Sequence, residues 1–181
     1  IIENKVIKFN LPQQSDTVEF IVVDTILNKT KPLFLWCQGS WPVPLFCEIE
    51  NYGYYFFGGG ISNFDYNKIT SKYHLVIISM PKTPIKGSKK NLNANYQYIP
   101  NAEKPYEFSE DYLKADYIEN YVNRANTVLN YLGKQKWVSK DKLIVAGHSQ
   151  GSKIATKLSL SRKDVTHLGL FAANPFGRID Q

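Results

Sequence analysis

One short segment of this sequence has the residue types and the spacing for nucleophilic chemistry. Ser149 stands between Gly147 and Gly151, after the apolar run 143–146 and before a run of helical pattern. A sharp turn from strand to helix would expose the serine hydroxyl, and it requires small residues on either side. The hydroxyl could then attack a carbonyl carbon while the backbone N–H of Gln150 stabilises the oxyanion. The segment predicts a nucleophile elbow, with a glycine-rich structural turn as the alternative.

The same segment resembles a known superfamily. Residues 141–151, Asp-Lys-Leu-Ile-Val-Ala-Gly-His-Ser-Gln-Gly, resemble the strand and turn of the α/β-hydrolases, within which they look like serine esterases and the dienelactone-hydrolase or prolyl-peptidase-like branches. The resemblance implies a serine hydrolase that cleaves a small-molecule ester or acyl substrate through an acyl-enzyme on Ser149, with an amide or peptide as second choice. The alternative is a catalytically incomplete, hydrolase-like binding domain.

A second oxyanion donor is expected after the apolar strand at residues 33–37. In the superfamily the loop after this strand supplies a backbone N–H, and here the loop reads Gln38-Gly39-Ser40-Trp41. Relatives often carry His-Gly at this place, but a backbone donor does not depend on the side chain of residue 38. The resemblance therefore implies the Ser40 N–H as the second donor, with a plain turn as the alternative.

Aromatic residues are frequent, with 12 tyrosines and 10 phenylalanines. Two segments rich in them, 41–57 and 96–108, are expected to leave the carboxyl ends of strands and to line the entrance of the site. Their rings would offer a stacking surface to an acyl or sugar-like group. Trp41 and His148 are the candidate pocket residues. The alternative is that these segments cover an otherwise exposed core.

The general base that a serine nucleophile needs has no evident place in this sequence. His148 lies within the turn itself, where its ring should point away from the attack geometry. His74 and His167 each precede an apolar run, so they should lie at the amino ends of parallel strands, whereas Ser149 lies at a carboxyl end. A five-residue strand is about 16 Å long, so neither ring should reach the hydroxyl. The order Ser149, Asp164, His167 is interpreted as a coincidence.

The acid that would orient the base is also unplaced. The superfamily usually carries it after a strand that would follow residue 181, and a minority of members suggest Asp180 instead. The chain therefore resembles a hydrolase that stops one or two strands short. One explanation is a fragment of a longer enzyme, and another is a degenerate hydrolase that binds without turnover. Residues 1–181 alone are expected not to be a competent hydrolase.

The remaining pattern predicts an α/β fold with a mainly parallel sheet, helices on both faces and an antiparallel N-terminal edge, in one domain over residues 1–181. The expected strands are 6–9, 18–23, 33–37, 75–80, 143–146 and 168–173, with helices at 109–132 and 150–160 and a helix end at 69–73. A turn is expected at 11–16 and a long loop at 82–107. In the first helix Leu113, Tyr117, Tyr121 and Val128 are expected to share one face.

Composition excludes several other classes. No run of 18 apolar residues exists, so no transmembrane segment is expected, and the lysines behind the net charge of +6 are scattered, which argues against nucleic acid. No cofactor is expected, because the histidines lack metal-ligand spacing and Gly58–Gly60 is not followed by the Lys-Ser or Lys-Thr of a P-loop. Cys37 and Cys47 are interpreted as buried thiols in preference to one bridge. The first residue, Ile1, indicates a removed N-terminus, through cleavage of a signal peptide or through artificial truncation. The sequence does not decide the compartment, and an extracytoplasmic location is the working hypothesis.

Overall fold

The computed structural model describes residues 5–13, 16–23, 27 and 29–173. In these residues the chain forms a six-stranded sheet in the order β1-β2-β6-β3-β8-β9 and a three-stranded sheet in the order β5-β4-β7. The strands are β1 (Val6–Gln13), β2 (Asp16–Val23), β3 (Lys31–Cys37), β4 (Phe46–Ile49), β5 (Gly53–Phe56), β6 (His74–Ile78), β7 (Lys86–Gly87), β8 (Val138–His148) and β9 (His167–Phe171). The helices are η2 (Gly58–Asn63), α1 (Tyr66–Lys72), η3 (Lys89–Asn91), α2 (Glu110–Ala115), α3 (Ile118–Leu132) and α4 (Gln150–Ser161).

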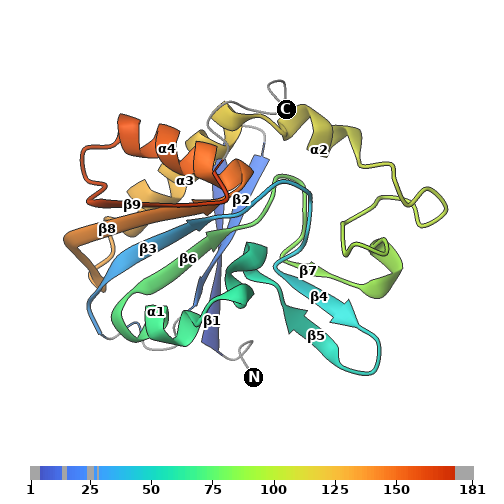
Figure 1. Cartoon of the computed structure of the whole chain (residues 1–181), viewed down its shortest axis with the longest axis horizontal. Helices are drawn as coiled ribbons and strands as arrows, with labels where there is room; N and C mark the ends of the chain where they lie inside the picture. Colours follow the sequence, from blue (N-terminus) through green and yellow to red (C-terminus); the bar gives the residue numbers. More distant parts are fainter. Residues whose placement is uncertain (1–4, 14–15, 24–26, 28, 174–181) are drawn as a thin grey trace.

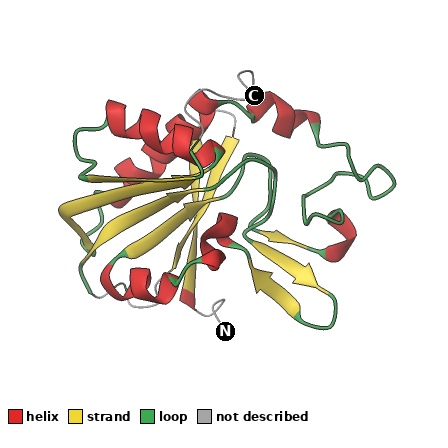
Figure 2. Ribbon diagram, viewed as in Figure 1, coloured by secondary structure: helices red, strands yellow, loops and turns green. Residues whose placement is uncertain are grey.

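The large sheet is parallel from β6 to β9 and antiparallel at its first edge. Strand β3 runs parallel to β6 and β8, and β8 runs parallel to β9, whereas β2 pairs antiparallel with β1 and β6. Helices α3 and α4 cover one face and α1 covers the other, as Figures 1 and 2 show. The predicted fold class and the predicted antiparallel edge are therefore confirmed. Among the described residues, no helix combines the length and apolarity needed to cross a bilayer.

The central strands are buried on both faces. In β3, Leu33 and Leu35 pack into the cluster formed with α3 and α4, whereas Trp36 packs into the opposite cluster with Ile61. A strand with two buried faces has a continuous apolar sequence, because neither set of alternating side chains meets water. This is why the sequence pattern located β3, β6 and β8.

The first hairpin corrects one expectation. The turn predicted at residues 11–16 is wrong, because β1 continues through Pro12 to Gln13, which pairs with Asp16. A proline lacks the N–H of a regular ladder, but an edge strand tolerates it where that N–H would face outward. The proline was therefore a misleading turn signal in this strand.

The helix predicted over residues 109–132 is in fact two helices. Helix α2 ends at Ala115 and α3 begins at Ile118, and the Asn120 side chain donates to the Ala115 carbonyl at 2.8 Å across the break. The expected common face is wrong as well. Tyr121 and Val128 are buried, whereas Leu113 and Tyr117 are exposed. The break interrupts the 3.6-residue period, so positions in α2 do not continue the buried face of α3.

The small sheet was not predicted. Its strands are only two to four residues long, too short for an alternating pattern, and β7 lies inside the segment 82–107 that was expected to be a loop. Figure 1 shows this sheet beyond the carboxyl ends of β3 and β6. The glycine run at 58–60 opens η2, where Trp36 Nε1 donates to the Gly59 carbonyl at 2.8 Å and a Cβ added to Gly59 would lie 2.4 Å from Gln38 Cβ.

A partly buried ion pair ties the first hairpin to α3. Arg124 is 2% exposed; its Nη1 lies 2.9 Å from Asp16 Oδ2 and its Nη2 donates to the Ser79 carbonyl at 3.2 Å. Partial burial acts to raise the pKa of Asp16, but hydrogen bonds from Lys82 and from the Thr17 backbone, together with the charges of Arg124 and Lys82, outweigh it and lower the pKa. Ionised Asp16 therefore stabilises the folded state.

Replacing this carboxylate should destabilise the fold in a pH-dependent way. We expect Asp16→Asn to lower the free energy of unfolding at pH 7 by about 2 kcal/mol, less than for a fully buried pair because Asp16 is partly exposed. The folded pKa lies below the unfolded value of about 3.9, so the difference from wild type should be complete above that pH and disappear as pH falls through the folded pKa. Urea unfolding of both proteins at several pH values measures this difference in the free energy of unfolding. An equal loss in the exposed control Glu103→Gln would contradict the assignment.

Candidate active site

Ser149 lies at the turn between β8 and α4. Strand β8 ends at His148, α4 begins at Gln150, and the Ser149 residue is exposed. Its backbone has φ 54° and ψ −119°, which is the conformation of the first central residue of a type II′ turn, a position that glycine dominates. Holding a serine there costs on the order of 1–3 kcal/mol. The predicted strand–turn–helix placement of Ser149 is confirmed.

The glycines on either side let three backbone segments approach one another. A Cβ added to Gly147 would lie 2.1 Å from the Gly151 carbonyl oxygen, and one added to Gly151 would lie 2.0 Å from the Cys37 carbonyl oxygen. Neither distance is sterically possible, so both positions require glycine. Since Cys37 ends β3, the first turn of α4 packs directly against the carboxyl end of the neighbouring strand.

Hydrogen bonds hold the turn to β9. The Ser149 N–H donates to the Phe171 carbonyl at 3.0 Å. Inside α4, Ser152 Oγ lies 2.8 Å from the Gly147 carbonyl oxygen and 3.0 Å from that of Phe171. The Ser152 residue is buried, and its hydroxyl links α4 to both strands. The backbone around Ser149 is therefore fixed from two sides.

The loop after β3 lies beside this turn, where the second donor was expected. A Cβ added to Gly39 would be 3.7 Å from Ser149 Cβ and 3.4 Å from His148 Nδ1, so the loop passes directly over the turn. Ser40 follows at once, and Trp41 has φ 85°, in the left-handed region that non-glycine residues seldom adopt. The loop thus brings the backbone of Gly39 close to the serine, with Ser40 next in sequence.

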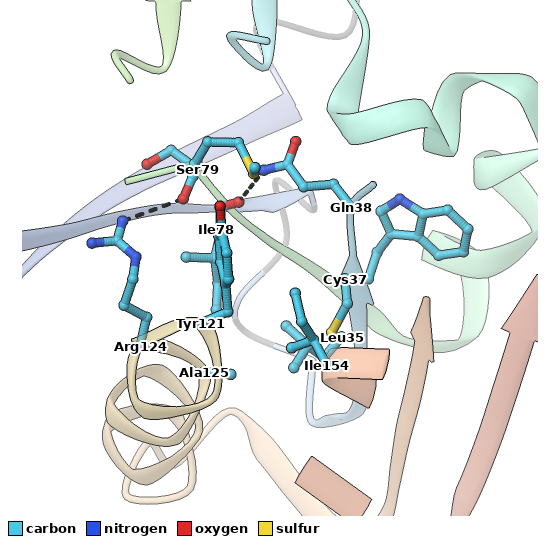
Figure 3. Close-up of a pocket in the computed structure, with 11 residues that line it drawn as sticks. Leu35, Cys37, Gln38, Ile78, Ser79, Tyr121, Arg124, Ala125 and Ile154 are labelled. Carbon is cyan, nitrogen blue, oxygen red and sulfur yellow. Dashed lines mark hydrogen bonds between the residues drawn. The ribbon is translucent and has the colours of Figure 1, made fainter. Parts of the chain in front are cut away.

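Gln38 anchors the start of this loop. Its side chain is buried, and Nε2 donates to the Ile78 carbonyl at 2.6 Å, which joins the ends of β3 and β6 (Figure 3). A cavity of about 30 Å³ lies beside it, lined from β3, β6, α3 and α4. A water molecule needs on the order of 10–15 Å³, so this space is too small for an organic substrate. Substrate would have to approach Ser149 from its exposed side.

The histidines lie where the sequence placed them. His74 opens β6 and pairs with Leu33, its Nε2 lying 3.0 Å from the Trp137 carbonyl oxygen, and His167 opens β9 and pairs with Ile144. Both residues are at the amino ends of parallel strands, whereas the β8–α4 turn is at the carboxyl ends.

The structure also shows the surroundings of His148 and Asp164, the other described candidates for a base and an acid. His148 is exposed next to the turn, and within the described residues no hydrogen bond joins the Ser149 hydroxyl to an imidazole. Asp164 pairs with Arg162 at 2.6 Å, and this ion pair lowers the pKa of its carboxyl. Asp180 lies outside the described residues.

Aromatic rings lie along the same loop. The Trp41 ring is 47% exposed and its centroid is 5.7 Å from that of Phe108. The other expected entrance residues gather on the small sheet, where Phe57 stands 5.3 Å from Tyr55 and 5.0 Å from Tyr96 between ring centroids. Trp41 and Phe108 are thus the rings that the structure links to the loop over Ser149.

The side chain of Gln150 contacts a carboxylate that sequence reasoning missed. Gln150 Nε2 donates to Asp116 Oδ1 at 3.2 Å, and the Tyr121 hydroxyl donates to the same oxygen at 2.7 Å. Burial raises the pKa of Tyr121, and its hydrogen bond to Asp116 raises it further. The sequence predicts Asp116 inside the helix at 109–132, and its pattern carries no signal for this contact.

The two cysteines are free and buried, as expected. Burial raises the pKa of each thiol to about 12, so neither is a thiolate at neutral pH. Across the described ranges, no group of three His, Cys, Asp or Glu side chains is arranged to hold a metal ion.

Comparisons with known proteins identify the fold. No family model matches the sequence, and no curated protein matches it. Among solved structures, the chain is similar to a proline iminopeptidase-related protein from Thermus thermophilus (10% identity, TM-score 0.56, 91% of this chain and 44% of that one). It is also similar to a serine hydrolase from Cycloclasticus zankles (15% identity, TM-score 0.52, 95% of this chain and 48% of that one). A third similar structure is an enantioselective mutant of an epoxide hydrolase from Aspergillus niger (15% identity, TM-score 0.52, 96% of this chain and 37% of that one). The chain has the α/β-hydrolase fold and spans less than half the length of these structures.

The close approach at Gly151 gives a direct test of the turn. We expect Gly151→Ala to lower the free energy of unfolding by about 3 kcal/mol, because its Cβ would overlap the Cys37 carbonyl. Gly133→Ala is the matched control, since Gly133 has φ −62° at the end of α3 and its nearest neighbour, the Leu129 carbonyl oxygen, would be 3.2 Å away. The control should change stability by less than about 1 kcal/mol. Equal stabilities of the two variants in urea would contradict the packing.

Relief of backbone strain at Ser149 should stabilise the protein. Ser149→Gly should raise the free energy of unfolding by about 1 kcal/mol, because the strain relieved exceeds the entropy that a glycine adds to the unfolded chain. Ser149→Ala keeps a Cβ at the same φ and should leave stability nearly unchanged. Differential scanning calorimetry compares the three proteins. A glycine variant that melts below the alanine variant would show that the turn is not strained.

Proposed function

We propose that this chain carries the nucleophile and the oxyanion donors of a serine hydrolase that cleaves an ester bond. The observation that carries the proposal is the exposed Ser149 with its strained backbone at the strand-to-helix turn of an α/β-hydrolase fold. Strain of this kind persists only where the surrounding structure enforces it, and such positions cluster at active sites. One of the similar structures is itself a serine hydrolase, which supports the same reaction class.

The proposed reaction proceeds through an acyl-enzyme. Ser149 Oγ attacks the ester carbonyl carbon, its proton passes to a general base, and the carbonyl oxygen becomes an oxyanion. Collapse of this intermediate breaks the bond to the alcohol oxygen, which receives the proton from the base. Water then attacks the acyl-enzyme by the same route, so the acid is released and Ser149 Oγ regains its proton.

Two backbone donors are proposed for the oxyanion. Gln150 is the first residue of α4, and the first N–H groups of a helix have no partner within the helix and lie at its positive end. Ser40 belongs to the loop that passes over the turn, and its N–H would be the second donor. Removing one such donor typically slows catalysis by about 100- to 1000-fold.

The proposed substrate is a small ester or acyl compound that rests against the exposed ring of Trp41, with Phe108 behind it. Gly147 and Gly151 would act indirectly, because they permit the backbone approach that holds Ser149 in place. His148, exposed beside the loop, would contribute to the rim of this pocket. No cofactor takes part in the proposed reaction.

A second candidate function is a hydrolase-like binding domain without turnover. It is favoured by the position of the histidines, since His74 and His167 lie at the far edge of the sheet and no imidazole is hydrogen-bonded to Ser149 in the described part of the chain. A serine without a base is a weak nucleophile at neutral pH. The two candidates differ in whether Ser149 is chemically reactive.

A fluorophosphonate probe on the full-length protein tests the proposal. We expect one stoichiometric adduct, located on Ser149 by peptide mass spectrometry and absent from Ser149→Ala. Ser71→Ala in α1 is the control, because this exposed serine lies on a helix that packs beside the amino end of β6, and it should be labelled like wild type. An unlabelled wild type would favour the binding domain, and labelling that survives Ser149→Ala would place the reactive group elsewhere.

A further inference from the structure

Two separate loops carry the proposed oxyanion donors. One follows β3 and contains Ser40, and the other is the turn that contains Gln150. Their N–H groups must point at one oxygen within a few tenths of an ångström, because displacement by about 1 Å can cost on the order of 100-fold in rate. Such precision requires that the two loops be held relative to each other.

Asp116 holds the turn on one side. Its Oδ1 accepts hydrogen bonds from Gln150 Nε2 at 3.2 Å and from the Tyr121 hydroxyl at 2.7 Å. Tyr121 is 7% exposed on α3, so its hydroxyl is a fixed donor. In the described residues, Gln150 Oε1 is buried without a hydrogen-bond partner. The contact to Asp116 is therefore what orients the Gln150 side chain.

Helix α2, whose C-cap residue is Asp116, also connects to the other loop, through the ring of Tyr112. The rings of Trp41, Phe108 and Tyr112 form a contiguous series, with centroids 5.7 and 5.8 Å apart. Burial raises the pKa of the Tyr112 hydroxyl and the charge of Asp116 adds to this. Tyr112 thus lies near the charge of Asp116, and its ring packs through Phe108 against Trp41.

We infer that Asp116 is a positioning residue that holds both proposed oxyanion donors in register, through its hydrogen bond with Gln150 on one side and through the ring series from Tyr112 by way of Phe108 to Trp41 on the other. The inference rests on the proposed function. The carboxylate lies in the break between α2 and α3, which leaves it free to face the elbow instead of a helix groove. The break between the two helices thereby acquires a role in the site.

The test compares two probes that differ in one atom. A fluorophosphonate places its phosphonyl oxygen in the oxyanion hole, whereas the fluorophosphonothioate places a sulfur there, and sulfur is a weak hydrogen-bond acceptor. The ratio of the two labelling rates at Ser149 therefore reports on the hole itself. A loss of general stability would not alter this ratio.

We expect Asp116→Ala in the full-length protein to slow labelling by the oxygen probe about 10- to 100-fold and to leave the sulfur probe much less affected. Asp116→Asn retains an acceptor oxygen and should restore most of the rate. Tyr121→Phe removes one donor to Asp116 and should give an intermediate loss, which keeps the test possible if the alanine variant does not fold. Tyr117→Phe, on an exposed neighbouring tyrosine, is the matched control and should behave like wild type.

The outcomes separate the two proposals. Wild-type labelling on Ser149 with unchanged rates and ratios in both Asp116→Ala and Tyr121→Phe would overturn the positioning role and leave the proposed function standing. An equal loss with both probes would also overturn it, because it would indicate general damage. A wild-type protein that reacts with neither probe would overturn the proposed function, and the positioning role with it.

Discussion

The whole site depends on the contact between the first turn of α4 and the end of β3. Gly151 lies so close to the Cys37 carbonyl that a single added carbon would be 2.0 Å from its oxygen, and Gly147 is equally close to Gly151. Because three backbones meet without side chains between them, the chain must reverse sharply between β8 and α4. The reversal forces Ser149 to φ 54° and exposes it.

This steric requirement explains why the sequence predicted the turn so well. Small residues at fixed spacing around a serine, after an apolar run, leave few other interpretations, and β3, β6 and β8 are found because strands buried on both faces have continuous apolar sequences. The positions of His74 and His167 were also predictable. Both open strands that run parallel to β8, so both lie at the end of the sheet away from Ser149.

Other features had no comparable signature. The strands of the small sheet are stabilised by pairing between segments distant in sequence, such as β4 with β7, and each is too short to show a period. The break after α2 depends on local hydrogen bonds, including that of Asn120 with Ala115. Asp116 was therefore assigned to a helix, and its contact with Gln150 could not be foreseen. Pro12 had the opposite effect. A proline usually indicates a turn, but here it lies within the edge strand β1, which tolerates it.

In chemical terms, the described residues place a strained serine beside the loop that follows β3, with an exposed indole ring on that loop and a carboxylate hydrogen-bonded to Gln150. The histidines at the opposite edge of the sheet take no part in this arrangement. The chain covers less than half the length of the hydrolase structures it resembles, so the proposed activity concerns the full-length protein.

The most direct test of the central claim is to trap the acyl-enzyme. Full-length protein is mixed with p-nitrophenyl acetate, quenched in acid within seconds, and examined by intact-protein and peptide mass spectrometry. The account predicts a mass increase of one acetyl group, located on Ser149 and accompanied by a stoichiometric release of p-nitrophenol. Acetylation confined to lysines, with no p-nitrophenol released beyond that seen with Ser149→Ala, would contradict it.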